Sequence, residues 1–478
     1  MSRALDPFDF GYPLGTSRRP KGLDLWSRAD KSARVIGPMG SGKTMRFFAP
    51  TIRRWAGPVL ATSTKPDLVE LTLDARKRDG RPVLAFDPQN IAPYLPRYRW
   101  LPFAGAEATE VAMTRAKALV AGSRTPGSAG QSEGASFFRG QAAKVLAALL
   151  HAAALDGARL DHLLTWARKM DDPVPLAILE SHPGAGPGWA EMLRAAITGD
   201  SRTVGNTAVT LLSALEPLSH QSVVDALQGD GEPTDFRNFL DAGGTIYLLG
   251  KDSEAASVAP LTTAVTEDLL DIAEAHALTS PAGRLDPPLL AALDEVANIA
   301  PIPSLRQRVA DGRGRGITAI YGLQGWASAV ARFGPDTAAE LASFTNHIIV
   351  FGGCKDRDFL QSTSDLCGQV ERVRKTRTTS GGDRGGVSTA THMVLEPVLR
   401  GDQIKGLGEG EALVLADNLA PVITHFDGMW TWDSWQEIER SIHELRRSAA
   451  VERDRQQAVR DDRGRKAADL WAARKAAA

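Results

Sequence analysis

Residues 35–44 read VIGPMGSGKT, and this stretch decides the fold class of the chain. A short apolar run passes into a glycine-rich loop of the form G-x-x-x-x-G-K-T, which is the pattern of a phosphate-binding P-loop. Glycines let successive backbone N–H groups converge on a phosphate without a Cβ in the way. The pattern predicts a nucleotide site of eight consecutive residues: Gly37, Pro38, Met39, Gly40, Ser41, Gly42, Lys43 and Thr44.

The last two residues of the loop are expected to carry most of its chemistry. Lys43 would supply the positive charge for the outer phosphates, and Thr44 would hold Mg²⁺ through its hydroxyl. Residues 32–36 are expected to form a strand before the loop. Residues 45–55 are expected to form a helix after it, kinked at Pro50, with its positive end toward the bound anion.

The length and composition fit a protein of several domains. At 478 residues the chain is too long for one ordinary core, which favours two or three domains. The formal net charge of −1 neither supports nor excludes a nucleic-acid partner, because a basic stripe can lie on a neutral molecule. Cys354 and Cys367 lack the spacing of a zinc site or a disulfide framework, which fits a reducing cytosol. We find neither a secretory signal nor an apolar run of about 18 residues, so a cytoplasmic chain without a membrane span is expected.

Short apolar runs bounded by turn residues recur along the chain. Most are apolar throughout, as in strands that helices cover on both faces of a parallel sheet. Helical stretches lie between several of them, which predicts an α/β fold with a mostly parallel sheet flanked by helices. The expected strands are residues 59–63, 82–87, 244–250, 289–294, 317–324, 347–353 and 412–416.

One long region breaks the alternation and predicts an inserted all-α domain. It shows helical periodicity without a strand, and the helices are expected at residues 111–121, 137–154, 161–169, 189–196 and 203–216. Gly- and Ser-rich residues 121–135, and the polar stretch 376–391, are expected to be flexible. The predicted organisation is an N-terminal extension (1–23), a first nucleotide-binding part (24–106), the all-α domain (107–235), a second nucleotide-binding part (236–432) and a charged helical tail (433–478). We expect the tail to be a solvated helix in preference to a docking segment for a partner.

Residues 288–295 (PLLAALDE) supply the acidic pair that a P-loop enzyme needs. The apolar run delivers Asp294 to the carboxyl edge of the sheet, where it would hold Mg²⁺ together with Thr44. Glu295 would orient the attacking water and accept its proton. An acidic pair after a strand is also common as a solvated turn, but the upstream P-loop favours the catalytic interpretation.

Two more candidate residues follow from the next strand and the segment before it. Residues 317–324 end in Gln324, a polar side chain placed to read the γ-phosphate. The preceding ADGRGRGI places Arg313 and Arg315 in an expected glycine-rich turn. From there either guanidinium could reach the γ-phosphate of a neighbouring subunit as an arginine finger, and a solvated basic turn is the alternative interpretation.

With these motifs the chain resembles a type IV secretion system coupling protein of the TraG/TraD class of conjugative DNA-transfer ATPases. The resemblance extends from about residue 14 to residue 426. Its most specific part is DEVANIAPIPSL followed by GRGRGI and LQGWA. The other matching stretches are PLGTSRRPKGLDLW, GPMGSGKT, GPVLATSTKPDLVELT, RPVLAFDPQ, NHIIVFGGCKDRDF and LEPVLRGDQIKGLGEGEALVLADNLAPVITHF.

The resemblance implies a RecA-like P-loop ATPase domain that binds ATP and Mg²⁺ and assembles into a hexameric ring. It implies that Lys43 and Thr44 bind nucleotide, that Asp294 and Glu295 are the magnesium and water-activating pair, and that Gln324 is the sensor. Arg313 matches the position of the family's trans-acting arginine. Members of the family typically bind DNA without sequence preference, take a relaxase–DNA substrate and deliver it to a membrane channel.

The chain also departs from the family pattern, and two other functions stay open. Members usually begin with transmembrane helices, whereas this sequence shows none before the ATPase domain. We therefore expect a cytoplasmic chain that a channel or anchor subunit recruits to the inner face of the plasma membrane. TKPD stands where the family commonly shows K-G-E, which leaves the role of Lys65 open. One alternative is an FtsK-type DNA translocase, although the charged tail lacks the apolar periodicity of a winged helix. The other is a nucleotide-switched recruitment protein that hydrolyses little ATP.

Overall fold

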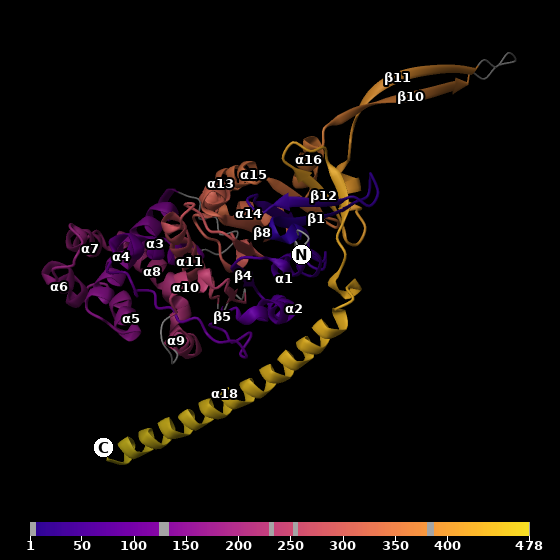
Figure 1. The fold of residues 1–478 in the computed structure, drawn as a ribbon. Helices are drawn as coiled ribbons and strands as arrows, with labels where there is room; N and C mark the ends of the chain where they lie inside the picture. Colours follow the sequence, from indigo (N-terminus) through magenta and orange to yellow (C-terminus); the bar gives the residue numbers. More distant parts are fainter. Residues whose placement is uncertain (1–5, 124–132, 229–233, 252–256, 380–386, 478) are drawn as a thin grey trace.

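An eleven-stranded sheet forms the centre of the molecule (Figure 1). The computed structural model describes residues 6–123, 133–228, 234–251, 257–379 and 387–477. The strands of the central sheet are β1 (Gly11–Ser17), β2 (Asp24–Arg28), β3 (Ala33–Ile36), β4 (Val59–Ser63), β5 (Val83–Phe86), β6 (Thr245–Leu249), β7 (Leu289–Leu293), β8 (Ile317–Leu323), β9 (His347–Phe351), β12 (Glu411–Ala416) and β13 (Val422–His425). A separate two-stranded ribbon consists of β10 (Gln369–Thr379) and β11 (Val387–Pro397).

The strand order combines a parallel part with an antiparallel edge. The order is β2-β1-β13-β12-β9-β3-β8-β7-β4-β6-β5. The strands from β9 to β5 pair in parallel, and β12, β13, β1 and β2 continue the sheet antiparallel beyond β9. Each of the eight expected strand segments forms a strand of this sheet, but 412–416 forms the antiparallel β12.

The N-terminal residues are part of this sheet, which the sequence did not indicate. Residues 1–23 were expected to form an extension, yet β1 pairs with both β2 and β13. The physical reason is burial, because Tyr12 and Leu14 of β1 lie in the hydrophobic core. The first part of the nucleotide-binding fold therefore includes β1.

Helices cover both faces of the sheet. They are α1 (Ala49–Arg54), α2 (Asp67–Arg76), α3 (Thr109–Gly122), α4 (Glu133–Leu155), α5 (Leu160–Arg168), α6 (Pro173–Ser181), α7 (Trp189–Ile197), α8 (Ser201–Leu215), α9 (Gln221–Gln228), α10 (Phe236–Asp241), α11 (Ala259–Thr279), α12 (Val296–Ile299), α13 (Leu305–Arg315), α14 (Trp326–Phe333), α15 (Pro335–Phe344), α16 (Arg357–Leu366), α17 (Gly401–Lys405) and α18 (Trp435–Ala477). Two buried apolar clusters result, one on each face, and successive strand residues such as Val35 and Ile36 belong to different clusters.

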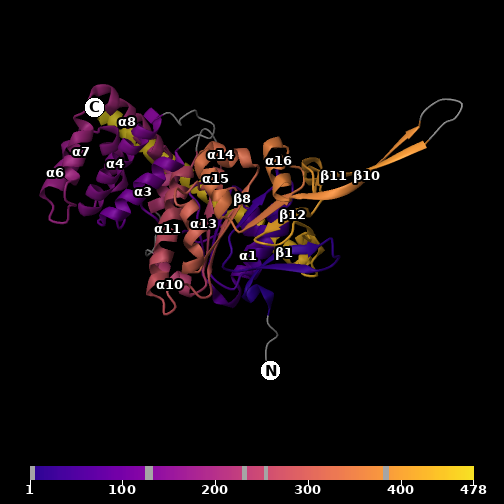
Figure 2. The ribbon, with the colours of Figure 1, turned by 90° about the horizontal axis from the view of Figure 1, so that it is seen from above.

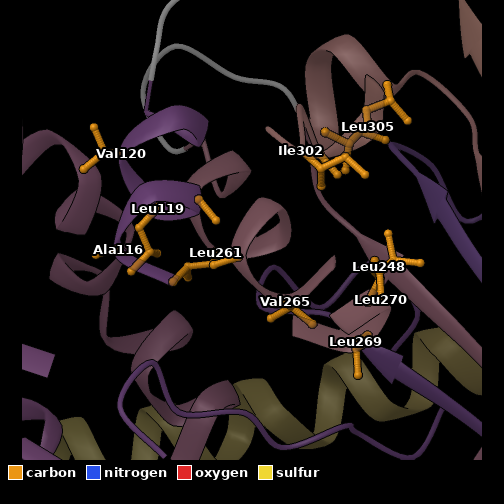
Figure 3. Packing of buried hydrophobic residues seen from close by; sticks show 14 of the residues in the cluster. Ala116, Leu119, Val120, Leu248, Leu261, Val265, Leu269, Leu270, Ile302 and Leu305 are labelled. Atoms are coloured by element: carbon orange, nitrogen blue, oxygen red, sulfur yellow. The ribbon is translucent and has the colours of Figure 1, made fainter. Parts of the chain in front are cut away.

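The helical region α3–α9 gathers at one end of the molecule, opposite the β10–β11 ribbon (Figures 1 and 2). Its link to the sheet is a continuous apolar core, in which Leu119 of α3 lies close to Leu261 of α11 (Figure 3). A buried ion pair between Arg115 and Asp268, 2.8 Å apart, joins the same two helices. This core fixes the position of the helical region against the nucleotide-binding fold.

Several local expectations need correction. Residues 45–55 form one helical segment, in which a π-helical turn, Thr44–Phe48, runs directly into α1, and Pro50, which has no N–H to donate, lies two residues after that turn ends. The polar stretch 376–391 was expected to be flexible, but its described residues extend β10 and β11 as a paired ribbon. The expected mobile loop 121–135 lies outside the described residues between 124 and 132.

The tail is a single helix, α18, as expected, and part of it packs on the rest of the molecule (Figure 1). The Arg446 guanidinium pairs with the buried carboxylate of Glu70 on α2 at 2.8 Å. Further along, Arg463 pairs with Asp225 of α9 at 3.3 Å. Among the described residues, no helix is both long and apolar enough to cross a bilayer.

Candidate nucleotide site

Four neighbouring parallel strands deliver the candidate residues to one edge of the sheet. Gly37 follows β3, Gln324 follows β8, Asp294 follows β7, and Ser63 ends β4. These strands are adjacent in the order β3-β8-β7-β4. Because the carboxyl ends of parallel strands meet at one edge, the predicted residues come together there although they are far apart in the sequence.

The P-loop has the backbone that its glycines permit. Gly40 and Gly42 have φ values of 80° and 87°, in the left-handed region that side chains disfavour. The Lys43 ammonium is buried and donates hydrogen bonds to the carbonyls of Gly37 and, at 3.4 Å, Pro38. Burial lowers the pKa of Lys43, and the nearby carboxylates of Asp294 and Glu295 oppose that shift.

Met39 differs from its neighbours in the loop. Its side chain is 70% exposed, so its contribution to a phosphate site would come from the backbone. Ser41 has the opposite character, since its hydroxyl oxygen is buried without a hydrogen-bond partner in the described part of the chain. A buried polar atom without a partner is costly, which suits a site that a ligand completes.

A direct hydrogen bond joins the P-loop to the acidic pair. Thr44 Oγ1 donates to Asp294 Oδ2 at 3.0 Å, and Thr62 Oγ1 donates to the Asp294 carbonyl at 2.9 Å. Burial raises the pKa of Asp294 to about 6, while the charge of Lys43 opposes the shift. The second carboxylate oxygen, Oδ1, is buried and has no hydrogen-bond partner among the described residues. The Thr44 hydroxyl and the neighbouring Asp294 carboxylate are suitable ligands for Mg²⁺, because this ion prefers oxygen ligands.

Glu295 is held in an unusual backbone conformation. Its φ of 56° and ψ of 42° lie in the left-handed region, which is uncommon for a residue with a side chain. Thr64 Oγ1 donates to one carboxylate oxygen at 3.3 Å, and Gln324 Nε2 donates to the other at 3.2 Å. Backbone strain of this kind persists where surrounding contacts enforce it and is concentrated at functional sites. The contact also places the predicted base and the predicted sensor in one hydrogen-bonded group.

Arg313 lies away from this group. It belongs to the last turn of α13, before β8, and so lies near the amino edge of the sheet. Its guanidinium is 56% exposed and pairs with Asp30 at 3.0 Å. The expected glycine-rich turn is wrong, because residues 312–315 continue α13 and Gly316, with a φ of 70°, ends it. A Cβ on Gly312 would lie 2.8 Å from the Ile317 carbonyl, so close packing explains that glycine.

The cavity over the P-loop contains residues that the sequence did not single out. Its volume is about 360 Å³. Besides the P-loop and the acidic pair, it is lined by Met45, Arg46, Ser63, Thr64, Lys65, Asp67, Glu409 and Trp430. Arg46 and Thr64 lie next to predicted motifs, whereas Glu409 and Trp430 come from the far end of the fold and carry no local motif.

Gly322 was also missed, although it lies inside a predicted strand. A Cβ at this position would lie 2.7 Å from Asp294 Oδ1 and 3.1 Å from the Phe48 ring. Gly322 thus leaves the space that the Asp294 carboxylate occupies. A lone glycine in an otherwise mostly apolar strand, ITAIYGL, is the signal that could have indicated such a close approach.

Comparisons with known proteins give matches in sequence and in fold. Residues 288–409 match the family model described as "TraM recognition site of TraD and TraG". No curated protein sequence gives a significant match. The fold is similar to that of the bacterial conjugative coupling protein TrwBΔN70, with a TM-score of 0.61 at 17% identity over 85% of this chain and 87% of that chain. TrwB with ADP and Mg²⁺ gives the same TM-score, identity and coverage. TrwB with the ATP analogue ADPNP gives 0.60 at 18% identity over 83% and 85%.

These matches confirm the fold class that the sequence predicts. The chain has a RecA-like P-loop NTPase fold with a mostly parallel sheet flanked by helices. They also confirm the resemblance to conjugative coupling proteins, in fold over most of the chain and in sequence over residues 288–409.

Proposed function

We propose that this chain is an ATP-hydrolysing coupling protein that moves DNA, as a relaxase–DNA substrate, toward a conjugative type IV secretion channel. The observation that carries the proposal is the 3.0 Å hydrogen bond between Thr44 and Asp294. It unites the P-loop and the acidic pair in one site, as a magnesium-dependent NTPase requires. The similar coupling protein TrwB has been solved with ADP and Mg²⁺ and with an ATP analogue.

Each predicted residue has a chemical task in this proposal. Thr44 and Asp294 would hold Mg²⁺, which supplies charge neutralisation to the phosphates when bound. Lys43 would exchange its contacts with the loop carbonyls for contacts with phosphate oxygens. Glu295 would orient water and accept its proton, and the amide of Gln324 holds its carboxylate in place.

Arg313 is assigned to a neighbouring subunit's site. Within one chain it lies near the amino edge of the sheet, whereas the P-loop lies at the carboxyl edge. An arginine that acts in trans needs a head-to-tail interface, and such an interface forms a ring when the rotation between subunits closes. We therefore propose a homo-oligomeric ring, hexameric by resemblance, in which Arg313 leaves Asp30 to complete the adjoining site.

A second cavity supports contact with DNA. It has a volume of about 500 Å³ and lies between α16 and α17, at the base of the β10–β11 ribbon. Its basic side chains are Lys355, Arg357, Arg400 and Lys405, and among the described residues only Arg400 has an ion-pair partner, Asp402 at 3.0 Å. The lining residues that the structure describes include no aromatic side chain, so the cavity suits backbone phosphates better than bases. Contact of this kind is indifferent to sequence and sensitive to salt.

The basic cavity is connected to the predicted sensor. Asp356 Oδ2 accepts a hydrogen bond from the Ala327 N–H, just after Gln324, at 3.2 Å. Asp356 Oδ1 accepts from the Phe359 N–H at 3.1 Å and caps α16. One carboxylate thus bridges the first turn of α14, which follows β8, and the helix that lines the cavity. This bridge favours a motor in which DNA stimulates hydrolysis.

A nucleotide-switched recruitment protein is the second candidate. The matched family model is named for partner recognition, and it covers the acidic pair, Gln324 and every lining residue of the basic cavity. In this alternative the nucleotide controls binding of a secretion substrate, and hydrolysis is slow. For the FtsK-type alternative we have no supporting observation, and the described residues of the tail, Trp435–Ala477, form the single helix α18.

An ATPase assay separates the two candidates. The full chain is assayed with and without single-stranded DNA, beside Lys43→Ala and Glu295→Gln. A motor is expected to be stimulated several-fold by DNA, to lose nucleotide binding in Lys43→Ala, and to bind ATP without turnover in Glu295→Gln. Slow hydrolysis that DNA does not change would favour the recruitment protein. Hydrolysis unchanged in Glu295→Gln would remove the assignment of the base.

A further inference from the structure

Trp430 lies at the mouth of the P-loop cavity, far from the P-loop in sequence. It belongs to a short helical turn after β13, Met429–Thr431, whose Met429 is fully buried in the core. The indole of Trp430 remains 43% exposed and lines the cavity together with the P-loop. Because the buried Met429 holds this turn in place, the half-exposed indole of Trp430 offers a pre-formed surface for a flat apolar ligand.

The indole is fixed in place by Arg46. The Arg46 guanidinium carbon lies 4.5 Å from the Trp430 ring centroid, within the range of a cation–π contact. Arg46 is itself held on two sides, by the Phe426 carbonyl at 2.8 Å and the Glu409 carboxylate at 2.7 Å. Because Arg46 follows Thr44 by two residues, this contact couples the position of the indole to the phosphate loop.

Three glycines make room for this arrangement. A Cβ on Gly42 would lie 2.8 Å from Arg46 Cδ, and one on Gly410 would lie 2.6 Å from Arg46 Nη1. A Cβ on Gly428 would lie 2.4 Å from the Trp430 ring. Distances below 3.0 Å do not occur without movement, so larger residues at these positions would displace the guanidinium or the indole. The glycines at positions 42, 410 and 428 therefore allow the backbone to lie close to the Arg46 guanidinium and the Trp430 indole.

We infer that Trp430 is the stacking platform for the base of a nucleoside triphosphate whose phosphates lie in the P-loop. The inference rests on the proposed nucleotide site and adds the part of the ligand that the P-loop does not bind. The cavity holds both surfaces, so a single ligand with an anionic end and a flat ring fits it. Every base has a π-face, so stacking on Trp430 recognises a base without choosing between adenine and guanine.

The test compares ligands with and without a base. Equilibrium affinities of the full chain for ATP, GTP and inorganic tripolyphosphate are measured with Mg²⁺, for the unaltered protein and for Trp430→Ala. The substitution is expected to lower the affinities for ATP and for GTP by a similar factor, roughly 5- to 150-fold, as for other base–aromatic stacks. Tripolyphosphate affinity is expected to stay unchanged, which also shows that the P-loop remains folded.

Two further variants sharpen the comparison. Trp430→Phe keeps an aromatic face and should recover most of the ATP affinity. Trp471→Ala removes an indole that is 66% exposed on α18, and should leave all three affinities unchanged.

The inference is overturned if Trp430→Ala binds ATP with the affinity of the unaltered chain. It is also overturned if the affinity for tripolyphosphate falls by the same factor as the affinity for ATP. Either result leaves ATP binding by the unaltered chain intact, and with it the proposed function. Failure of the unaltered chain to bind ATP would instead overturn both.

Discussion

Gly322 lies directly against the Asp294 carboxylate, and a Cβ on this glycine would be 2.7 Å from Oδ1. Gly322 lies within β8 and Asp294 directly follows the neighbouring parallel strand β7, so neither can retreat without disturbing one of these strands. The oxygen that Gly322 leaves free is the one without a hydrogen-bond partner among the described residues. The absence of a side chain at position 322 therefore shapes the proposed magnesium site.

The first prediction concerns this glycine. Gly322→Ala should displace the Asp294 carboxylate and reduce Mg²⁺-dependent hydrolysis at least tenfold, with a loss of about 1–3 kcal/mol in unfolding free energy from overpacking. Gly140→Ala on α4 is the matched control, because a Cβ there meets nothing within 4 Å. The measurements are ATPase rate against Mg²⁺ concentration and chemical unfolding. A Gly322→Ala enzyme with unchanged Mg²⁺ dependence would contradict the assignment of Asp294.

The second prediction follows from the raised pKa of Asp294. Its folded-state pKa of about 6 lies above the ordinary value of 3.8, so the ionised carboxylate destabilises the folded chain. This cost is absent below about pH 4, grows as the pH rises, and is complete above about pH 6. Asp294→Asn should therefore stabilise the chain at pH 7.5 by about 1–3 kcal/mol without Mg²⁺, and by less at pH 5.

Urea unfolding at the two pH values measures this difference. Asp402→Asn is the control, because an exposed Arg400 partner lowers the pKa of Asp402 and removing that carboxylate should stabilise the chain at neither pH. An Asp294→Asn variant whose unfolding free energy is lowered equally at pH 5 and pH 7.5 would contradict a pKa of Asp294 raised by burial.

The third prediction concerns the basic cavity. Replacing both Lys355 and Arg357 by Ala should weaken binding of single-stranded DNA and lower the slope of log affinity against log salt by about 1.4, since each lost phosphate contact removes about 0.7. The double variant should keep its basal ATPase rate and lose stimulation by DNA. Lys466→Ala on α18, whose side chain pairs with Asp462 at 2.8 Å, serves as the control. An unchanged salt slope would place the DNA elsewhere.

The sequence predicted the central part of the site because its signals are local. In a parallel sheet, the residue after each strand lies at one edge, so the apolar runs ending at Asp294 and Gln324 were enough to bring those residues to the P-loop. The Thr44–Asp294 and Gln324–Glu295 contacts follow from that rule and from the strand order.

The remaining features depend on tertiary contacts that local patterns do not contain. Arg46 bonds to Phe426, 380 residues away, and no motif marks Trp430. Glycines at 312 and 314 indicated a turn, yet the burial of Leu305 and Val309 on the same helix stabilises α13. Polar residues next to a glycine-rich stretch concealed the pairing of β10 with β11.

The fourth prediction concerns Arg313 and distinguishes a trans-acting residue from a surface ion pair. Arg313→Ala should leave ATP affinity and stability nearly unchanged, because its pairing with Asp30 is largely exposed and contributes little. Hydrolysis should fall at least a hundredfold, since a finger arginine stabilises charge only in the transition state. Mixed with Glu295→Gln chains, which are also inactive alone, the variant should recover part of the activity, because an Arg313→Ala subunit keeps Glu295 and can receive Arg313 from a Glu295→Gln neighbour.

Two matched variants make the interpretation of that experiment specific. Asp30→Asn removes the partner of Arg313 without removing the guanidinium, so it should retain activity if the ion pair only stores the side chain between turnovers. Arg315→Ala removes the nearby guanidinium, 3.8 Å from Glu274, and should behave like the unaltered chain. Mixtures of Arg313→Ala and Glu295→Gln that stay inactive would show that each subunit works with its own arginine alone. An Asp30→Asn variant as inactive as Arg313→Ala would show that activity depends on the Arg313–Asp30 ion pair and not on contact of Arg313 with a neighbour's phosphate.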